Sequence, residues 1–531
     1  MAAKQPKAEP ELRKSTNIQG NILAPFNKPH QAFLFVNFRN DKDSARSWLA
    51  ELRERGPVAN TKDVAEHNDK FKKQGQNAIE PQQWLAVSLT RSGLVTLHPE
   101  LAADLAQFEA FWAGPLGARR DRYGGASVTT TAALLGDEGK SDPSGWVIGG
   151  PRQEPVDALV TLAADDLPRD QDHPVGDELL VSLIRTERER AKSAGLLELW
   201  LQRGHAIRGD EGWHEDHFGF REGISQPGVL GFTRQSDEAR RRRLEDAEHP
   251  GSPVVATGEF LLGHLGERRL DLASRPLRTP EWMQDGSFQV FRRLTQDRDR
   301  WNDQMAELEQ VHGIRSSVLK AKAIGRHPNG CPLAPEADCN PEDKDPSKDT
   351  LNDFDYSQDV EGVHTPLFAH IRKVNPRDND VYYRAHRLLR RGIPFDDTKA
   401  DRDEATDLGM LFNAFMASIE DQFEFIQRSW ANSPRSPRGT ADGPDALIGK
   451  GGTRRVLRLQ DTTSTLESSD DHKQDTGAVY TPPRLTEHQL DFGQFVRTTG
   501  AVYAFAPSIE TLKLLAEEGP IPSVPAGSDV G

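Results

Sequence analysis

The segment Leu367-Phe-Ala-His-Ile-Arg-Lys-Val-Asn-Pro-Arg377 places one histidine, His370, after an apolar run and before a cluster of basic residues. Twenty residues after this histidine comes Arg390, in the stretch Leu388-Leu-Arg-Arg-Gly-Ile-Pro-Phe395. Leucines precede Arg390 and Arg391, and Gly-Ile-Pro follows them, so we expect the pair at the end of an element near the core. These two segments organise the rest of the chain.

His370 and Arg390 carry groups that suit one kind of chemistry. An imidazole can ligate a haem iron. A guanidinium beside such an iron can stabilise the charge that develops when the O–O bond of a peroxide breaks. A third segment, Phe218-Gly-Phe-Arg-Glu-Gly-Ile-Ser-Gln-Pro227, adds the carboxylate of Glu222 between two glycines that permit a tight turn. A carboxylate there could carry a proton from one peroxide oxygen to the other.

Charged residues near His370 complete this hypothesis. Arg372 and Arg377 could hold the propionates of a haem, because arginine pairs bidentately with carboxylates. A peroxidase also needs a hydrogen-bond partner on the second ring nitrogen of its iron ligand. Glu420 and Asp421 are the candidates that we expect for this role.

A rival site lies in Trp213-His-Glu-Asp-His217. His214 and His217, with Glu215 or Asp216 and with His205, are residue types that bind metals at close spacing. The His-Glu-x-x-His helix signature is missing. A non-haem metalloenzyme built on these histidines therefore stays open as an alternative.

Size and composition limit the classes of protein. The chain has 531 residues, of which 36% are hydrophobic and 28% charged, enough for two or more domain-sized units. No apolar run reaches the ~18 residues of a membrane helix. Residues 1–13 lack the apolar core of a signal peptide, so we expect a cytoplasmic protein. The net charge of −15 argues against a nucleic-acid partner. Two cysteines, Cys331 and Cys339, are expected to be reduced thiols.

Strands and helices alternate along the chain. Segments with β-branched and aromatic residues predict strands over 30–38, 83–89, 157–163, 288–294, 410–416 and 501–507. Apolar residues at helical spacing predict helices over 177–201, from 295 to about 311, over 422–428 and after Ser508, with a further short helix after Arg91. Polar stretches rich in Asp, Ser, Gly and Pro, which we interpret as surface loops, cover 234–252, 335–362, 396–407 and 433–486.

The two halves repeat this order of elements, which suggests two similar α+β halves. We expect a disordered tail over 1–14, an N-terminal half over 15–250, a C-terminal half over 251–520 and a flexible tail over 521–531. The polar segment 433–486 is an insertion in the second half and the best candidate for local disorder.

Several strings together resemble the dye-decolorising (DyP-type) haem peroxidases, particularly their longer fungal-like and cyanobacterial-like branches. Besides the three segments quoted above, the matching strings are Asn17-Ile-Gln-Gly20, Gly258-Glu-Phe-Leu-Leu-Gly263, Asp285-Gly-Ser-Phe-Gln-Val-Phe-Arg-Arg-Leu294, Gly325-Arg-His-Pro-Asn-Gly-Cys-Pro-Leu333 and Phe505-Ala-Pro507. They follow the order of the family and span nearly the whole chain.

The resemblance implies two ferredoxin-like halves, each an antiparallel sheet with helices, and one b-type haem per chain in the second half. It implies a hydrogen-peroxide-dependent enzyme that oxidises dyes, phenols and other small aromatic one-electron donors through a ferryl intermediate. His370 would be the proximal iron ligand, Arg390 the distal arginine and Glu222 the distal carboxylate. The matching strings also place Arg326, Phe220, Gly223 and Ile224 around the cofactor. The sequence leaves monomer and homo-oligomer open.

One position departs from the family pattern, which carries Asp where this chain has Glu222. The longer side chain could still reach a peroxide, or it could be misplaced by about an ångström, which can cost ~100-fold in rate. A haem carrier or sensor on the same fold, with little turnover, therefore remains an alternative.

Overall fold

The structure is a computed structural model. It describes residues 11–55, 58–74, 80–121, 127–167, 176–210, 212–233, 254–266, 279–344, 346, 351–377, 386–399, 407–450, 454–460 and 485–521. The chain divides into two compact units, which are described separately. Unit 1 comprises Met1–Asp297, Arg384–Phe425 and Val496–Gly531, and unit 2 comprises Arg298–Tyr383 and Ile426–Phe495.

Four strands in the first part of unit 1 form an antiparallel array in the order β2-β5-β1-β6. Helices α1 and α2 connect β1 to β2, and α7 connects β5 to β6. This order and these connections define a ferredoxin-like half. The strands are β1 (His30–Asn37), β2 (Gln83–Leu89), β5 (Ala158–Ala164) and β6 (Leu197–His205), and the helices are α1 (Lys42–Arg55), α2 (Thr61–Gln74) and α7 (Glu178–Ser193).

The later strands of unit 1 repeat the arrangement. β17 pairs with β11, β11 with β14, and β14 with both β12 and β13, all antiparallel. In the sheet the strands follow the order β17-β11-β14 and then β12 with β13, which is again the order of a ferredoxin-like half. The predicted α+β fold class is therefore confirmed. The strands are β11 (Ser287–Gln296), β12 (Leu389–Arg390), β13 (Ile393–Asp396), β14 (Leu408–Met416) and β17 (Val496–Ala506).

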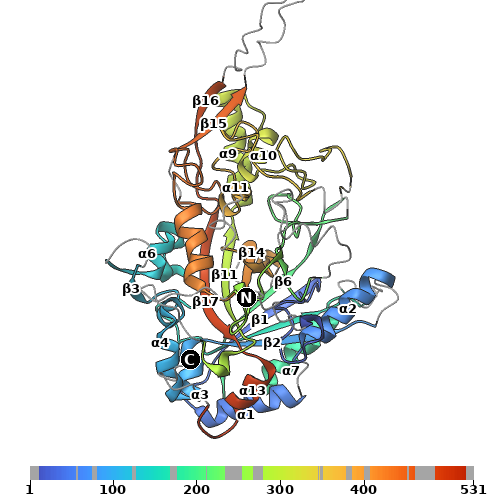
Figure 1. Cartoon of the computed structure of the whole chain (residues 1–531), viewed down its shortest axis with the longest axis vertical. Helices are drawn as coiled ribbons and strands as arrows, with labels where there is room; N and C mark the ends of the chain where they lie inside the picture. Colours follow the sequence, from blue (N-terminus) through green and yellow to red (C-terminus); the bar gives the residue numbers. More distant parts are fainter. Residues whose placement is uncertain are drawn as a thin grey trace, which may run out of the picture. The chain divides into compact units, whose positions relative to one another are not determined.

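Among the described residues, both arrays belong to one nine-stranded sheet, which β17 and β2 join through the pair Phe505 and Leu89. One face of this sheet packs on helices, with Trp48 of α1, Leu183 of α7 and Leu512 of α13 (Ile509–Ala516) in a common apolar cluster. Helices α1 and α13 run side by side there (Figure 1).

The other face of the sheet carries a second apolar cluster. Phe33 of β1 and Phe291 of β11 lie there with ring centroids 5.0 Å apart, although β17, β2 and β5 separate their strands. A Cβ atom on Gly204 of β6 would clash with Ile393 of β13, so these two strands also lie close together. The sheet therefore curves strongly around this cluster.

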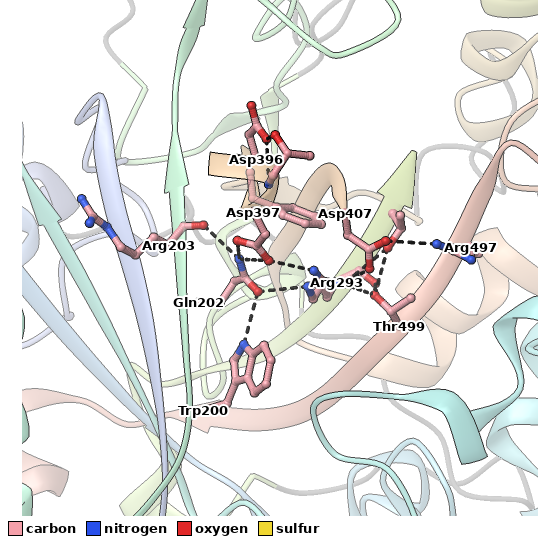
Figure 2. A network of polar contacts seen from close by, with 12 residues as sticks. Trp200, Gln202, Arg203, Arg293, Asp396, Asp397, Asp407, Arg497 and Thr499 are labelled. Carbon is pink, nitrogen blue, oxygen red and sulfur yellow. Dashed lines mark hydrogen bonds and ion pairs between the residues drawn. The ribbon is translucent and has the colours of Figure 1, made fainter. Parts of the chain in front are cut away.

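A buried arginine, Arg293, ties the strands together beside the second cluster. Its guanidinium contacts Asp397 at 2.8 Å, Asp407 at 3.1 Å and Gln202 at 2.9 Å, and it also donates to Thr499 (Figure 2). The network thus connects β11, β6 and β17 with the segments that flank β13 and β14. It holds the end of β13 and the start of β14, and β14 is the strand that pairs with β12 and hence with Arg390.

Unit 2 is smaller, and its described residues combine short helices, one hairpin and long irregular segments. It contains α9 (Arg298–His312), α10 (Ser316–Ile324), α11 (His370–Val374), the π-helical turn η10 (Ile426–Ala431) and a hairpin of β15 (Arg454–Gln460) with β16 (Leu485–Asp491). Helix α9 confirms the helix predicted to follow residue 294.

The remaining short elements lie in unit 1. The helices are α3 (Arg91–Leu97), α4 (Ala102–Ala106), α5 (Glu109–Ala113), α6 (Thr131–Leu135) and the π-helical η9 (Ile419–Glu424). The strand pairs are β3 (Ala118–Arg120) with β4 (Val128–Thr130), β7 (Ile207–Arg208) with β8 (His214–Glu215), and β9 (Gly228–Val229) with β10 (Val254–Val255). The 3-10 turns are η1 (Leu12–Lys14), η3 (Pro99–Leu101), η4 (Gly139–Ser141), η5 (Pro143–Gly145), η6 (Thr257–Glu259), η7 (Glu281–Met283) and η8 (Asp397–Lys399).

Two local predictions are wrong. The helix predicted over 177–201 ends at Ser193, because Gly195 takes a left-handed φ of 77° and the chain then enters β6. The tail predicted over 1–14 is structured from Leu12, which is 4% exposed in η1 and donates its N–H to Gly231. Residues 1–10 and the tail beyond Ile521 lie outside the described residues.

The prediction of two reduced cysteines is also wrong. Cys331 and Cys339 form a disulfide with their Cα atoms 5.6 Å apart. The intervening turn brings the two residues within the distance that a disulfide can bridge. Two cysteines cannot form a framework for a whole fold, but they can close one local loop.

The polar segments are only partly surface loops. Phe354 and Tyr356, within 335–362, are buried with Ala334 in a small cluster of unit 2. Asp445, within 433–486, is fully buried. Segment 234–252, and residues 461–484 of the insertion, lie outside the described residues. No described helix of the chain is both long enough and apolar enough to span a bilayer.

Candidate functional site

His370 begins helix α11 in unit 2, and its ring contacts a buried carboxylate. Its Nδ1 atom lies 2.9 Å from Oδ2 of Asp445. The side chain of Asp445 has no exposed surface, whereas that of His370 is 26% exposed. A ring that donates from Nδ1 has its lone pair on Nε2, which is the atom that can ligate a metal.

Backbone groups hold Asp445 in place. Its Oδ1 atom accepts the N–H groups of Leu447 at 2.7 Å and Ile448 at 3.0 Å. Burial alone would raise the pKa of Asp445, but the His370 ring and these N–H donors outweigh it and lower this pKa. The carboxylate therefore stays ionised beside the imidazole.

The flanking chain fixes both residues. The backbone N–H of Asp445 donates to the carbonyl oxygen of Ala431 in η10. The N–H of Ala446 donates to the carbonyl oxygen of Phe368, just before α11. The ammonium group of Lys373, on α11, donates to Ser433 at 2.7 Å. The imidazole and its carboxylate thus sit on segments that bind each other within unit 2.

Asp445 replaces the partners that we expected for His370. Glu420 instead accepts a hydrogen bond from Arg119 at 2.8 Å, and Asp421 accepts one from the hydroxyl of Ser418 at 3.0 Å. The prediction missed Asp445 because it lies 75 residues away in a stretch that looked like a solvent-exposed insertion. A sequence pattern contains no signal for a contact over such a separation.

Arg390 lies on β12 in unit 1, where its backbone pairs with β14. Its guanidinium donates to the carbonyl of Ser225 at 2.5 Å. The side chain of Gln226 makes two further bonds with the Arg390 backbone, at 3.1 and 3.2 Å. Segment 225–226 follows the Glu222 turn directly, so the structure joins the turn and the arginine strand as the sequence suggested.

Glu222 lies on the turn between the two predicted glycines. Gly219 and Gly223 both take left-handed φ values, of 84° and 72°, which favour glycine. The backbone N–H of Glu222 donates to the carbonyl oxygen of His214 at 2.8 Å. Desolvation by the surrounding protein lowers the pKa of the Arg390 guanidinium, and the negative charge of Glu222 opposes this shift. The carboxylate and the guanidinium are therefore electrostatic neighbours.

The two neighbouring arginines, Arg390 and Arg391, have different contacts. Arg391 is 9% exposed, and its guanidinium binds backbone carbonyls, including that of Arg390 at 2.9 Å. It donates to the carbonyls of Asn21 at 2.8 Å, Ile22 at 2.7 Å and Leu23 at 3.2 Å. It fastens β12 to the N-terminal segment, while Arg390 keeps its guanidinium on the side of the Glu222 turn.

Three further arginines were expected near a cofactor, and all three are buried in unit 2. Arg372 pairs with Asp359 at 3.2 Å. Arg326 and Arg377 donate to backbone carbonyls and lie over the Phe354 ring. These contacts stabilise the small core of unit 2, and a role toward haem propionates stays a prediction.

Phe220, Gly223 and Ile224 all belong to the Glu222 turn. Phe220 is 6% exposed, and Ile224 is partly buried. The structure places these residues beside Glu222, and their contact with a cofactor stays a prediction.

The rival metal site is not assembled. Among the described residues, which include His205, His214 and His217, no group of three metal-binding side chains is placed to hold an ion. Nε2 of His217 instead lies 2.8 Å from the carbonyl oxygen of Phe395 on β13. The non-haem metalloenzyme is therefore not supported.

Comparisons with known proteins agree with the resemblance. The model of the family described as "Dyp-type peroxidase, C-terminal" matches residues 269–438. Peroxidase 2 of Mycetinis scorodonius is 28% identical over 460 residues, which cover 82% of this chain and 76% of the relative. A multifunctional dye peroxidase of Amycolatopsis is 27% identical over 453 residues, covering 82% and 85% of the two chains.

The fold also matches solved structures. The crystal structure of a DyP-type peroxidase from Anabaena superposes with a TM-score of 0.68 at 23% identity, covering 94% of both chains. At 23% identity, the superposition supports the fold alone. The sequence relatives and the family model both indicate the dye-decolorising (DyP-type) peroxidases, to which this chain is similar over most of its length.

Proposed function

We propose that the protein is a peroxidase that binds one haem b per chain and uses hydrogen peroxide to oxidise small aromatic molecules. The observation that carries this proposal is the His370 ring bonded through Nδ1 to the buried, ionised Asp445. A carboxylate on the second ring nitrogen makes an imidazole a stronger donor to iron. The donor set therefore fits a haem iron on Nε2 of His370.

The residues of unit 1 supply the acid–base part of the reaction. Glu222 accepts the proton from one oxygen of hydrogen peroxide and delivers it to the other, leaving, oxygen. Arg390 stabilises the negative charge that builds up on the peroxide as its O–O bond weakens. Bound haem would supply the redox chemistry that passes the two oxidising equivalents of hydrogen peroxide to two one-electron donors.

The substrate class follows from the relatives. Several are named dye-decolorising peroxidases, and one structurally similar peroxidase is solved as a complex with 2,6-dimethoxyphenol. Dyes and phenols are therefore the first donors to test with this chain.

Steady-state oxidation of a dye by hydrogen peroxide tests the function. We expect turnover by the haem-loaded wild type, loss of turnover in Arg390→Leu and near-wild-type turnover in the matched control Arg208→Leu, an exposed arginine of β7. Neutralising a group that stabilises transition-state charge costs ~100-fold or more. A haem-loaded wild type without turnover would instead favour the haem carrier or sensor.

The cytoplasmic location expected from the N-terminal sequence stays a prediction. The Cys331–Cys339 disulfide argues for an oxidising compartment, because disulfides are rare in reducing cytosol. Fractionation of the native cells, with the protein followed by immunoblot, decides between the cytoplasm and an oxidising compartment.

A further inference from the structure

The turn that carries Glu222 is built around a second carboxyl group, that of Asp216. Oδ1 of Asp216 accepts the backbone N–H groups of Phe218 and Phe220, both at 3.0 Å. The N–H of Asp216 donates back to the carbonyl of Phe220 at 3.0 Å. These bonds, with a further one from the N–H of Gly219 to the carbonyl of Asp216 at 3.1 Å, fix the backbone that leads directly into Glu222.

Neighbouring elements hold this turn as well. The side chain of Gln296, at the end of β11, lies close enough to the Asp216 carboxyl group to lower its pKa. His217 contacts the carbonyl of Phe395 on β13. Asp216 therefore stands where the Glu222 turn meets the sheet that carries Arg390.

The charges around Asp216 come from Glu222 and, beyond it, Arg390. Desolvation, followed by the negative charge of Glu222, raises the pKa of Asp216 to about 7, against the opposing effect of its N–H donors. Arg221 lies on the same turn with its guanidinium over the Trp213 ring, 5.4 Å from the centroid. The two carboxyl groups thus influence each other's ionisation.

We propose that Asp216 is the positioning residue for Glu222, both through the turn that its carboxyl group ties and through the charge interaction between the two carboxyl groups. This inference rests on the proposed role of Glu222 in proton transfer. It assigns to this chain a pair of carboxyl groups in place of a single distal acid.

The pair has a defined dependence on pH. Below about pH 7, Asp216 is mostly neutral, so Glu222 can ionise without repulsion from its neighbour. Above about pH 7, the added charge of Asp216 makes Glu222 a stronger base toward peroxide. Asp216 therefore affects the rate of the reaction with peroxide through Glu222, and this effect changes at about pH 7.

Two variants separate the turn from the charge. Asp216→Asn keeps an oxygen that accepts the N–H groups of Phe218 and Phe220 but removes the charge. Asp216→Ala removes both. Asp210→Asn, at an exposed position of the preceding turn, is the matched control.

The kinetic experiment follows the single-turnover reaction of the holoenzyme with hydrogen peroxide by stopped flow across pH. We expect Asp216→Ala to lose ~10- to 100-fold at every pH, because a displacement of about an ångström has that cost. For Asp216→Asn we expect a rate near wild type at acid pH and a ratio of wild type to variant that grows as pH rises through about 7. An Asp216→Ala rate equal to that of Asp210→Asn, or a constant Asp216→Asn ratio, would overturn the proposal.

A second measurement does not depend on activity. Because folding raises the pKa of Asp216, its neutral form favours the fold, and that contribution to stability is lost as pH rises through about 7. The thermal midpoint of Asp216→Asn relative to wild type should therefore increase between about pH 5 and about pH 8, by roughly 2 °C. In a Glu222→Gln background this increase should shrink, because the repulsion is already gone.

These outcomes distinguish failure of the proposal from failure of the proposed function. A wild type that does not react with peroxide sinks the function, while the thermal cycle still reports whether the carboxyl groups are coupled. Equal midpoint differences at both pH values, with or without Glu222, would refute the carboxyl pair even in an active enzyme.

Discussion

At the scale of single residues, the account depends on a buried charge beside the ring of His370. An ionised carboxylate is costly to bury unless it is paired and fully hydrogen-bonded. Asp445 meets both conditions, with the His370 ring on one oxygen and two backbone N–H groups on the other. We interpret the buried charge of Asp445 as the means of keeping the imidazole of His370 basic.

Replacing Asp445 with Asn should keep the shape and remove the charge. We expect haem affinity to fall ~10- to 100-fold, as for other partners of metal-bound histidines, and the reduction potential of the haem to rise, because the imidazole donates less strongly. Asp442→Asn is the control, since Asp442 is a nearby buried carboxylate that pairs with Arg458. Spectroelectrochemical titration measures the potentials, and equal potentials in both variants would refute the role of Asp445.

Glu222 can be tested through the charge and the length of its side chain. Glu222→Gln removes the proton acceptor, so the rate constant with hydrogen peroxide should fall ~10²- to 10⁴-fold. Glu222→Asp retains a carboxylate and should recover a large part of that loss. Stopped-flow spectroscopy gives both values. If Glu222→Gln reacted as fast as Glu222→Asp, the carboxylate would not be the proton carrier.

The sequence indicated some of these residues and not others. His370, Glu222 and Arg390 stand in strings with recognisable neighbours, and the structure brings Glu222 and Arg390 onto adjoining segments. Asp445 and the role of Asp216 could not be predicted. Each depends on contacts that the folded backbone creates, and a polar residue in a polar stretch gives no sign of burial.

At the scale of elements, the strands were predictable and their limits less so. The apolar runs predicted β2 with its observed limits, and β5 and β11 to within a few residues. β17 begins five residues earlier than its apolar stretch, at Val496, because Val496, Arg497 and Thr498 still pair with β11. Pairing with a neighbouring strand extends a strand beyond its apolar residues.

The network around Arg293 offers a test of how the sheet is held. Arg293 is 2% exposed and bridges Asp397 and Asp407 (Figure 2). Arg293→Met should lower the free energy of unfolding by about 3–5 kcal/mol, because it leaves the carboxylate of Asp397 without its cation and that of Asp407 with Arg497 alone.

Denaturant unfolding followed by circular dichroism measures this loss. Arg298→Met serves as the control, since Arg298 is solvent-exposed, with 53% of its side-chain surface accessible. If the two variants unfolded at the same denaturant concentration, the Arg293 network would contribute nothing to stability.

At the scale of the whole molecule, the two ferredoxin-like halves were predictable but the compact units were not. Both arrays of strands belong to unit 1, whereas unit 2 consists of segments that lie on either side of β12, β13 and β14 in the sequence. The sequence order of elements reveals a repeated topology. It does not reveal which loops between those elements gather into a core of their own.

The disulfide gives a prediction that concerns the chain as a whole. Thiol titration of the denatured protein should find no free thiol before reduction and two after it, since Cys331 and Cys339 are the two cysteines of the sequence. Alkylation before lysis protects the native redox state during the preparation. Two free thiols without reduction would contradict the disulfide.

The central claim is that His370 binds a haem that reacts with peroxide. The most direct test is the visible absorption spectrum of the haem-loaded full chain, wild type beside His370→Ala, before and after one equivalent of hydrogen peroxide. We predict a Soret band in the wild type that depends on His370 and shifts within seconds of mixing. A Soret band that is the same in His370→Ala, or one that peroxide leaves unchanged, would contradict the claim.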